Sequence, residues 1–124
     1  MWKPNHIVED ERVQRMSFLP YEVVLLFFLT ENAIYASPLK KGNETNVNLP
    51  SIQEIVQGCA YAGTHYVVLL HNHPNTNFLF PSREDIVSTM MYKALLEKYN
   101  VILHDHIIIS EGGMQYSFKQ HGIL

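Results

Sequence analysis

The chain has 124 residues, enough for one domain with a hydrophobic core, and its 47% hydrophobic and 17% charged residues are typical of a folded protein. Its formal net charge of -3, with Lys and Arg scattered, indicates no surface for nucleic acid. The single cysteine, Cys59, excludes an intramolecular disulfide framework and any site that needs two thiolates, so we expect a reducing compartment, the cytoplasm.

The apolar runs of the sequence are too short to cross a membrane. The longest, Val23–Leu29, is far shorter than the roughly 20 residues that a membrane-spanning helix requires. The N-terminal segment also lacks the apolar stretch of a signal peptide. We therefore expect no membrane partner.

The first 20 residues are polar with few apolar positions, so we expect a lead-in segment or short helix, followed by one domain over residues 21–124. Residues 22–29 form a continuous β-branched and aromatic run, which is typical of a strand buried on both faces. Residues 33–37 follow a turn and are expected to complete a hairpin, and residues 38–50 have the composition of a loop.

A short helix and a second buried strand are predicted next. Ser51 and Glu54 have the spacing of a capping box, which opens a helix that Gly63 can end. Cys59 lies on the apolar side of this helix and is expected to pack as a small hydrophobic residue. Residues 65–70 have the composition of a second buried strand.

The last third of the chain predicts the longest helix and a final pair of strands. Apolar residues from Ile86 recur at helical spacing to about residue 99, with Met90 and Met91 among them. Residues 101–109 and 114–118 follow as strands. The order β-β-α-β-α-β-β predicts an α/β fold with a mixed β-sheet flanked by helices.

The segment "LLHNHPNTNFLFPSRED" contains the residues best suited to bind a metal ion or take part in a reaction. His71 and His73 end a strand two residues apart, so both side chains lie on one face, about 6.6 Å apart along the strand. Asp85 is in the first turn of the next helix, whose positive N-terminal end favours an ionised carboxylate. A His-His-Asp set leaves one tetrahedral position for water, as in catalytic zinc sites. The pattern predicts a zinc centre.

Each part of this pattern also has a purely structural explanation. Taken alone, Ser82 and Asp85 are more simply a helix capping box, and a lone pair of strand-end histidines is more often hydrogen-bonded than metal-bound. The combination of both histidines, a proline, a loop and a Ser-Asp pair at a helix start favours the metal site.

Glu22 is the candidate acid/base. A zinc hydrolase needs a group that moves a proton to the leaving amine. Glu22 precedes seven apolar residues, a position that suits a carboxylate facing a polar cleft. A solvated charge at a strand end explains Glu22 equally well.

The same segment resembles the signature of a known family. "HNHPNTNFLFPSRED" resembles the H-x-H-P…S-x-x-D signature of the JAMM (JAB/MPN) metallopeptidases, and "DHIII…EGG…YSF" extends the resemblance to the JAB domain of the RadC family. The resemblance covers about residues 20–118 and is specific over residues 71–86 and 105–118. It implies the JAB/MPN architecture, which is similar to the fold of the cytidine deaminases.

The resemblance also implies roles for individual residues. His71, His73 and Asp85 would bind Zn2+, Ser82 would hydrogen-bond the water and help to stabilise the oxyanion, and Glu22 would be the general acid/base. The loop between His73 and Ser82 is one residue longer than is usual in the family, and the extra residue can bulge outward.

Two further features of the sequence bear on the predicted site. Residues 78–80, Phe-Leu-Phe, are expected to tuck onto the core, with contact to a substrate or partner as the alternative. A second His-x-His, formed by His104, Asp105 and His106, could be a rival metal site, but no carboxylate at a helix start completes it. Asp105 and His106 are therefore expected to hydrogen-bond the ligands of the first metal site and orient them, or to lie on a strand surface.

The sequence favours a zinc-dependent hydrolase of peptide or isopeptide bonds, with an isopeptide-linked protein as a candidate substrate. The alternative is a non-catalytic RadC-family scaffold or binding module, with partners in DNA repair or recombination. A zinc base deaminase is disfavoured, because that chemistry uses H-x-E with P-C-x-x-C and this chain has one cysteine. A homodimer is compatible with this sequence.

Overall fold

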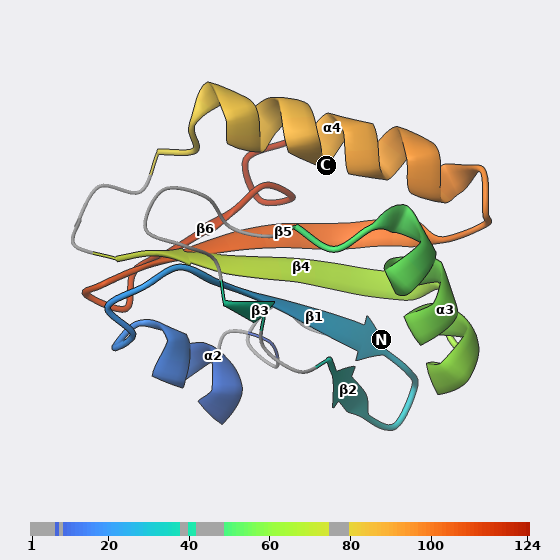
Figure 1. The fold of residues 1–124 in the computed structure, drawn as a ribbon, viewed down its shortest axis with the longest axis horizontal. Coiled ribbons are helices and arrows are strands. Elements are labelled where there is room, and N and C mark those ends of the chain that lie inside the picture. The colour runs from blue at the N-terminus through green and yellow to red at the C-terminus, as the bar shows by residue number, and fades with distance from the viewer. Residues whose placement is uncertain (1–6, 8, 38–39, 42–48, 75–79) are drawn as a thin grey trace.

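The computed structural model contains one β-sheet with helices packed against both faces (Figure 1). It describes residues 7, 9–37, 40–41, 49–74 and 80–124. The elements in chain order are α2 (Glu11–Met16), β1 (Val23–Leu29), β2 (Ile34–Ala36), β3 (Lys40–Lys41), α3 (Ile52–Ala62), β4 (Tyr66–His73), α4 (Arg83–Glu97), β5 (Ile102–Ser110) and β6 (Gln115–Ser117).

The strands of the described residues are arranged in the order β2-β1-β4-β5-β6. On the edge of β1 that pairs with β2, β3 pairs with the first two residues, Val23 and Val24. The pair β4 and β5 is parallel, whereas the other pairs are antiparallel. A parallel pair needs a crossover connection, and α4 supplies it. The predicted α/β fold with a mixed sheet is thus confirmed. Helix α2 lies within the first 20 residues, where a lead-in segment or short helix is expected, and β3 lies inside the predicted loop.

The two faces of the sheet carry separate cores. Alternate residues of β1 point to opposite faces, and all seven are buried, as the sequence predicts. One face packs on α2 and the other on α3 and α4; Figure 1 shows α4 and α2 on opposite sides of the sheet. Ile7, Val13 and Met16, all within the first 20 residues, belong to the core on the α2 face.

The short helix α3 begins and ends as predicted. Ser51 accepts a hydrogen bond from the Glu54 amide at 3.1 Å, and Gly63 ends the helix with a φ of 72°. A Cβ at Gly58 would lie 2.2 Å from the Phe28 ring, so glycine allows α3 to approach β1 closely. Cys59 is buried in this core, and burial raises the pKa of its thiol to about 11. It packs as a small hydrophobic residue.

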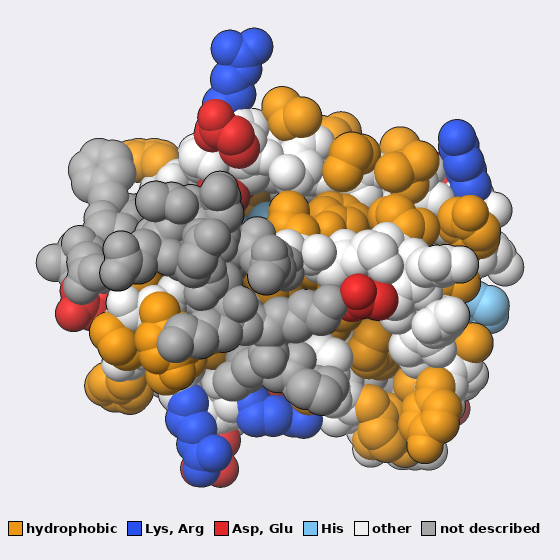
Figure 2. Space-filling model, viewed as in Figure 1, with side chains coloured by type: hydrophobic (Ala, Val, Ile, Leu, Met, Phe, Trp, Pro, Cys, Tyr) orange, Lys and Arg blue, Asp and Glu red, His pale blue; other side chains and the backbone are white. Residues whose placement is uncertain are grey.

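The long helix α4 buries a different face from the one its apolar residues predict. Thr89, Tyr92 and Leu96 are buried, whereas Met90 and Met91 are 44% and 50% exposed. The Tyr92 hydroxyl donates to the Pro50 carbonyl at 2.5 Å, which fixes this rotation of the helix. Figure 2 shows the resulting hydrophobic side chains on the outer surface over α4.

The described part of the chain contains no helix that is long and apolar enough to span a membrane. Of the residues predicted to tuck onto the core, Phe80 is 71% exposed, so that residue is not tucked. Residues 78–79 and most of the predicted loop at 38–50 lie outside the described residues.

Candidate metal centre

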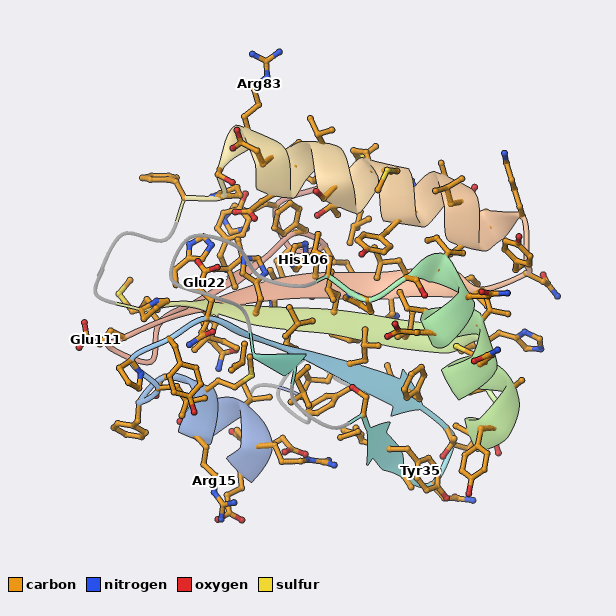
Figure 3. The ribbon with its side chains drawn as sticks, viewed as in Figure 1. Arg15, Glu22, Tyr35, Arg83, His106 and Glu111 are labelled. Atoms are coloured by element: carbon orange, nitrogen blue, oxygen red, sulfur yellow. The ribbon has the colours of Figure 1, made fainter. Side chains whose placement is uncertain are left out.

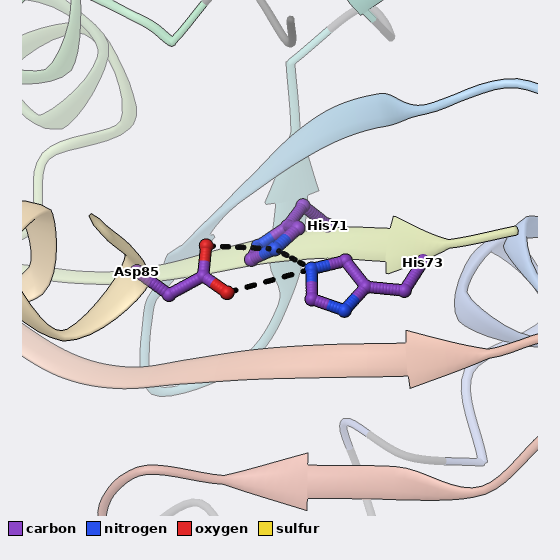
Figure 4. Close-up of side chains that lie close together, drawn as sticks. All are labelled: His71, His73 and Asp85. Carbon is purple, nitrogen blue, oxygen red and sulfur yellow. Dashed lines mark hydrogen bonds and ion pairs between the residues drawn. The ribbon is translucent and has the colours of Figure 1, made fainter. Parts of the chain in front are cut away.

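The structure brings His71, His73 and Asp85 together at one point (Figure 4). The two histidines occupy alternate positions at the end of β4 and therefore share the sheet face covered by α3 and α4. Their Nε2 atoms are 2.9 Å apart. Asp85, in the first turn of α4, places Oδ1 3.4 Å from Nε2 of His71 and Oδ2 3.5 Å from Nε2 of His73.

These separations fit the ligand set of a small divalent metal ion. Donor atoms that lie 2.0–2.1 Å from a tetrahedral zinc ion are about 3.3 Å from one another. The two histidine nitrogens are 2.9 Å apart, and each lies 3.4 to 3.5 Å from one of the two Asp85 oxygens. With one donor atom from each residue, all three lie within 4.8 Å of one another. Among the residues that the structure describes, this is the one group of His, Cys, Asp and Glu side chains able to hold a metal ion. Two imidazoles and one carboxylate are donors that suit zinc.

The position of Asp85 depends on the capping box at the start of α4. The Ser82 amide donates to Oδ2 of Asp85 at 2.9 Å, and the Asp85 amide donates to Oγ of Ser82 at 3.1 Å. The structural explanation of the Ser-x-x-Asp motif is thus confirmed. It does not compete with the metal site, because the cap turns the Asp85 carboxylate toward the histidines.

The electrostatics of the cluster favour the metal-binding states of Asp85 and His73. Burial alone would raise the pKa of Asp85, but hydrogen bonding and charge attraction from His71, with the bonds to Ser82, hold that pKa well below its usual range. Burial and the neighbouring His71 lower the pKa of His73. An ionised carboxylate beside a neutral imidazole is the form that coordinates a cation.

Glu22 lies on the same side of the sheet as the three candidate ligands. It precedes β1 in the alternation that directs Val24 toward α3 and α4, and Figure 3 shows it on the side of the sheet that α4 covers. Burial raises the pKa of Glu22, the charge of His71 lowers it and that of Asp85 raises it. The net result is a raised pKa, the direction of shift that suits a carboxyl group acting as an acid/base.

Asn72, which the sequence analysis did not single out, fixes the segment that carries Glu22. It lies between the two histidines and points to the opposite sheet face, where it is 1% exposed. Its Oδ1 accepts from the Val23 amide at 2.7 Å, and its Nδ2 donates to the carbonyls of Met16 and Tyr21 at 3.2 and 3.0 Å. These bonds hold both ends of the turn from α2 into β1. The only sequence signal was a polar residue at an inward-facing strand position.

Asn72→Ala is expected to lower the free energy of unfolding by about 2–4 kcal/mol, because the truncated side chain removes three hydrogen bonds to the backbone, including the buried bond from the Val23 amide. Urea unfolding, followed by circular dichroism, measures the change. Asn32→Ala, at an exposed bend, is the matched control and should unfold like the parent. An Asn72→Ala midpoint equal to that of the parent would contradict this assignment.

The two predicted supporting residues have different surroundings. Nε2 of His106 lies 2.7 Å from Nδ1 of His71, and the His106 ring stacks on Phe118 with 4.6 Å between centroids. The Asp105 carboxylate instead accepts from the Ser117 hydroxyl at 2.5 Å and the Lys119 amide at 3.0 Å, and so fastens the C-terminal segment.

His104 does not join the metal cluster. Its ring contacts Tyr66 edge-on, with 6.4 Å between centroids. It also lines a cavity of about 840 Å³ with Thr30 and Lys119. Of the two histidines in the rival His-x-His, His106 therefore lies beside the cluster and His104 lies away from it.

The family of the chain follows from comparison with known proteins. A family model described as the RadC-like JAB domain matches residues 5–123. The chain belongs to the RadC-like JAB family. The resemblance drawn from residues 71–86 and 105–118 is thereby confirmed.

Relatives of this RadC-like domain include several UPF0758 proteins. It is 34% identical over 107 residues to one from Variovorax paradoxus, which covers 85% of this chain and 46% of that protein. It is 30% identical over 110 residues to one from Clostridium botulinum, at 88% and 47% coverage. For YfjY of Escherichia coli the identity is 29% over 104 residues, at 83% and 63% coverage. The chain spans about half the length of the first two relatives.

Proposed function

We propose that this RadC-like domain is a zinc-dependent hydrolase of peptide or isopeptide bonds. The observation that carries the proposal is the convergence of the Nε2 atoms of His71 and His73 and the Asp85 carboxylate within 4.8 Å of one another. Glu22, with its raised pKa, supplies an acid/base group on the same side of the sheet. Three protein ligands are the number found in catalytic zinc sites, which keep one position open.

In this proposal His71, His73 and Asp85 hold the ion. A bound zinc ion would supply Lewis-acid polarisation of the substrate carbonyl and of the attacking water. Glu22 accepts the proton of that water and returns it to the amine nitrogen as the C–N bond breaks, so one carboxyl group serves both steps.

Ser82 has a defined part in the same proposal. Its Oγ accepts a hydrogen bond from the Asp85 amide, and its own proton can be donated to the developing oxyanion. Because Ser82 begins α4, it also stands at the positive end of the helix dipole, which favours negative charge.

The test combines metal content with turnover. We expect tag-free protein supplied with zinc at neutral pH to hold about one zinc per chain and to cleave members of a panel of peptides and isopeptide-linked conjugates. Chelation should abolish cleavage, and added zinc should restore it. Failure to bind stoichiometric zinc would refute the proposal, and stable zinc binding with no cleavage across the panel would favour the RadC-family scaffold instead.

A further inference from the structure

A line of three hydrogen bonds connects Nδ1 of His71, the ring nitrogen that faces away from the proposed metal, to the backbone of α4. Nδ1 of His71 lies 2.7 Å from Nε2 of His106, and Nδ1 of His106 lies 2.6 Å from the Thr89 hydroxyl. That hydroxyl lies 2.6 Å from the carbonyl oxygen of Asp85. The line therefore starts at one proposed ligand and ends on the backbone of another.

The direction of every bond in this line follows from its last acceptor. A carbonyl oxygen cannot donate, so the single Thr89 proton is directed to Asp85. The Thr89 oxygen must then accept from His106, which places the proton of that imidazole on Nδ1. His106 is 2% exposed and its two ring nitrogens face His71 and Thr89, neither of which is an anion, so the buried ring is neutral. Its Nε2 is consequently an acceptor.

His71 stands at the other end of this line of hydrogen bonds. Since Nε2 of His106 accepts, Nδ1 of His71 must carry the proton and donate it. In a neutral His71, the form that binds a cation, the remaining nitrogen Nε2 then has the free lone pair. This is the atom that lies 2.9 Å from Nε2 of His73 and 3.4 Å from Oδ1 of Asp85. The opposite direction would place a proton on Nε2, where it would block coordination.

We propose that Thr89 and His106 are positioning residues that fix the proton of His71 on Nδ1 and so prepare Nε2 for the metal. The inference rests on the proposed metal centre. Metal-bound histidines commonly donate their second N–H to a carboxylate, a backbone carbonyl or water. Here an imidazole and a hydroxyl stand between the ligand and the carbonyl.

Burial and ring stacking restrict the side chains that form these hydrogen bonds to one arrangement. Thr89 is 0% exposed and His106 2% exposed, so water has little access to either as a competing partner. The ring of Phe118 is stacked on His106 at an interplanar angle of 8°, which holds the plane of the imidazole. The orientation of His71 is therefore decided by residues of α4, β5 and the C-terminal segment together.

The test compares Thr89→Val with Thr89→Ser. Valine keeps the shape of threonine but removes the hydroxyl, and we expect zinc affinity, measured by chelator competition, to fall about 10–100-fold. Serine keeps the hydroxyl and should retain most of the affinity. Nitrogen-15 NMR of the metal-free protein should show His71 protonated at Nδ1 in the parent and in Thr89→Ser, and a mixture of tautomers in Thr89→Val.

Thr64→Val is the matched control. The Thr64 hydroxyl also donates to a carbonyl, that of Leu29, and accepts from the Tyr66 amide, but it lies at the opposite end of β4 from the histidines. Zinc affinity should be unchanged in this variant. Thermal unfolding of all variants separates a loss of fold from a loss of affinity.

The outcomes distinguish this inference from the proposed function. Parent-like zinc affinity and an Nδ1-protonated His71 in Thr89→Val would overturn the inference and leave the metal centre intact. If the parent binds no zinc, the metal centre fails, and the tautomer of His71 in the metal-free protein still decides the inference. A His71 protonated at Nε2 in the parent would overturn it.

Discussion

Glu22→Gln should lower kcat about 10²–10⁴-fold on any conjugate that the parent cleaves, while zinc content stays at about one ion per chain. Glutamine matches glutamate in size but does not accept a proton from water at neutral pH. Because Glu22 is not among the three converging ligands, metal binding should survive the substitution. Steady-state kinetics and elemental analysis of the same preparation measure the two effects.

Glu31→Gln provides the control for this experiment, because Glu31 is exposed in the bend after β1. It should leave kcat and zinc content unchanged. Turnover by Glu22→Gln at the parental rate would remove Glu22 from the proposed reaction. Loss of zinc together with activity would instead assign Glu22 to metal binding.

Asp85→Ala should lower the zinc affinity, because it removes one donor atom of the proposed ligand set. The loss should exceed the roughly 10–100-fold that is typical when a residue that only supports a ligand is substituted. The substitution also removes the carboxylate that accepts from the Ser82 amide, so part of any effect could come from a frayed helix. Asp85→Asn separates the two, since its amide oxygen can still accept from Ser82 but carries no charge. Chelator competition gives the affinity, and thermal unfolding reports on the helix.

Glu84→Ala is the matched control, because Glu84 is an exposed acid in the same first turn of α4. It should bind zinc like the parent. If Asp85→Ala and Asp85→Asn both kept parental affinity, the metal would have to be held without this carboxylate. His73→Ala should behave like Asp85→Ala, because the Nε2 atom of His73 lies in the same cluster.

The periodicity of the sequence was sufficient to predict most of the fold. Strand β1 and helix α3 have local signals, a long apolar run in one case and the Ser51 and Gly63 ends in the other. The rotation of α4 has no such signal. Met90 and Met91 look like core residues, yet Tyr92 is the one turned inward, because its hydroxyl finds a partner at Pro50, far away in the sequence.

The site divides in the same way. His71, His73 and Asp85 could be singled out because strand-end histidines and a helix-start carboxylate form a local pattern. Asn72 and Thr89 could not, since their partners are brought to them only by the folded sheet and helix. The role of a buried polar side chain can be assigned only when its hydrogen-bond partners, which are distant in the sequence, are known.

Three consecutive residues of β4 face in alternate directions, two imidazoles toward α4 and the Asn72 amide toward α2. A shift of this strand by one residue against β1 and β5 would move the amide into the ligand cluster and both imidazoles into an apolar layer. The register of β4 therefore sets two things at once: the positions of the proposed ligands and the hydrogen bonds of Asn72 to the segment that carries Glu22. Insertion or deletion of a single residue within β4 should be far more damaging than its size suggests.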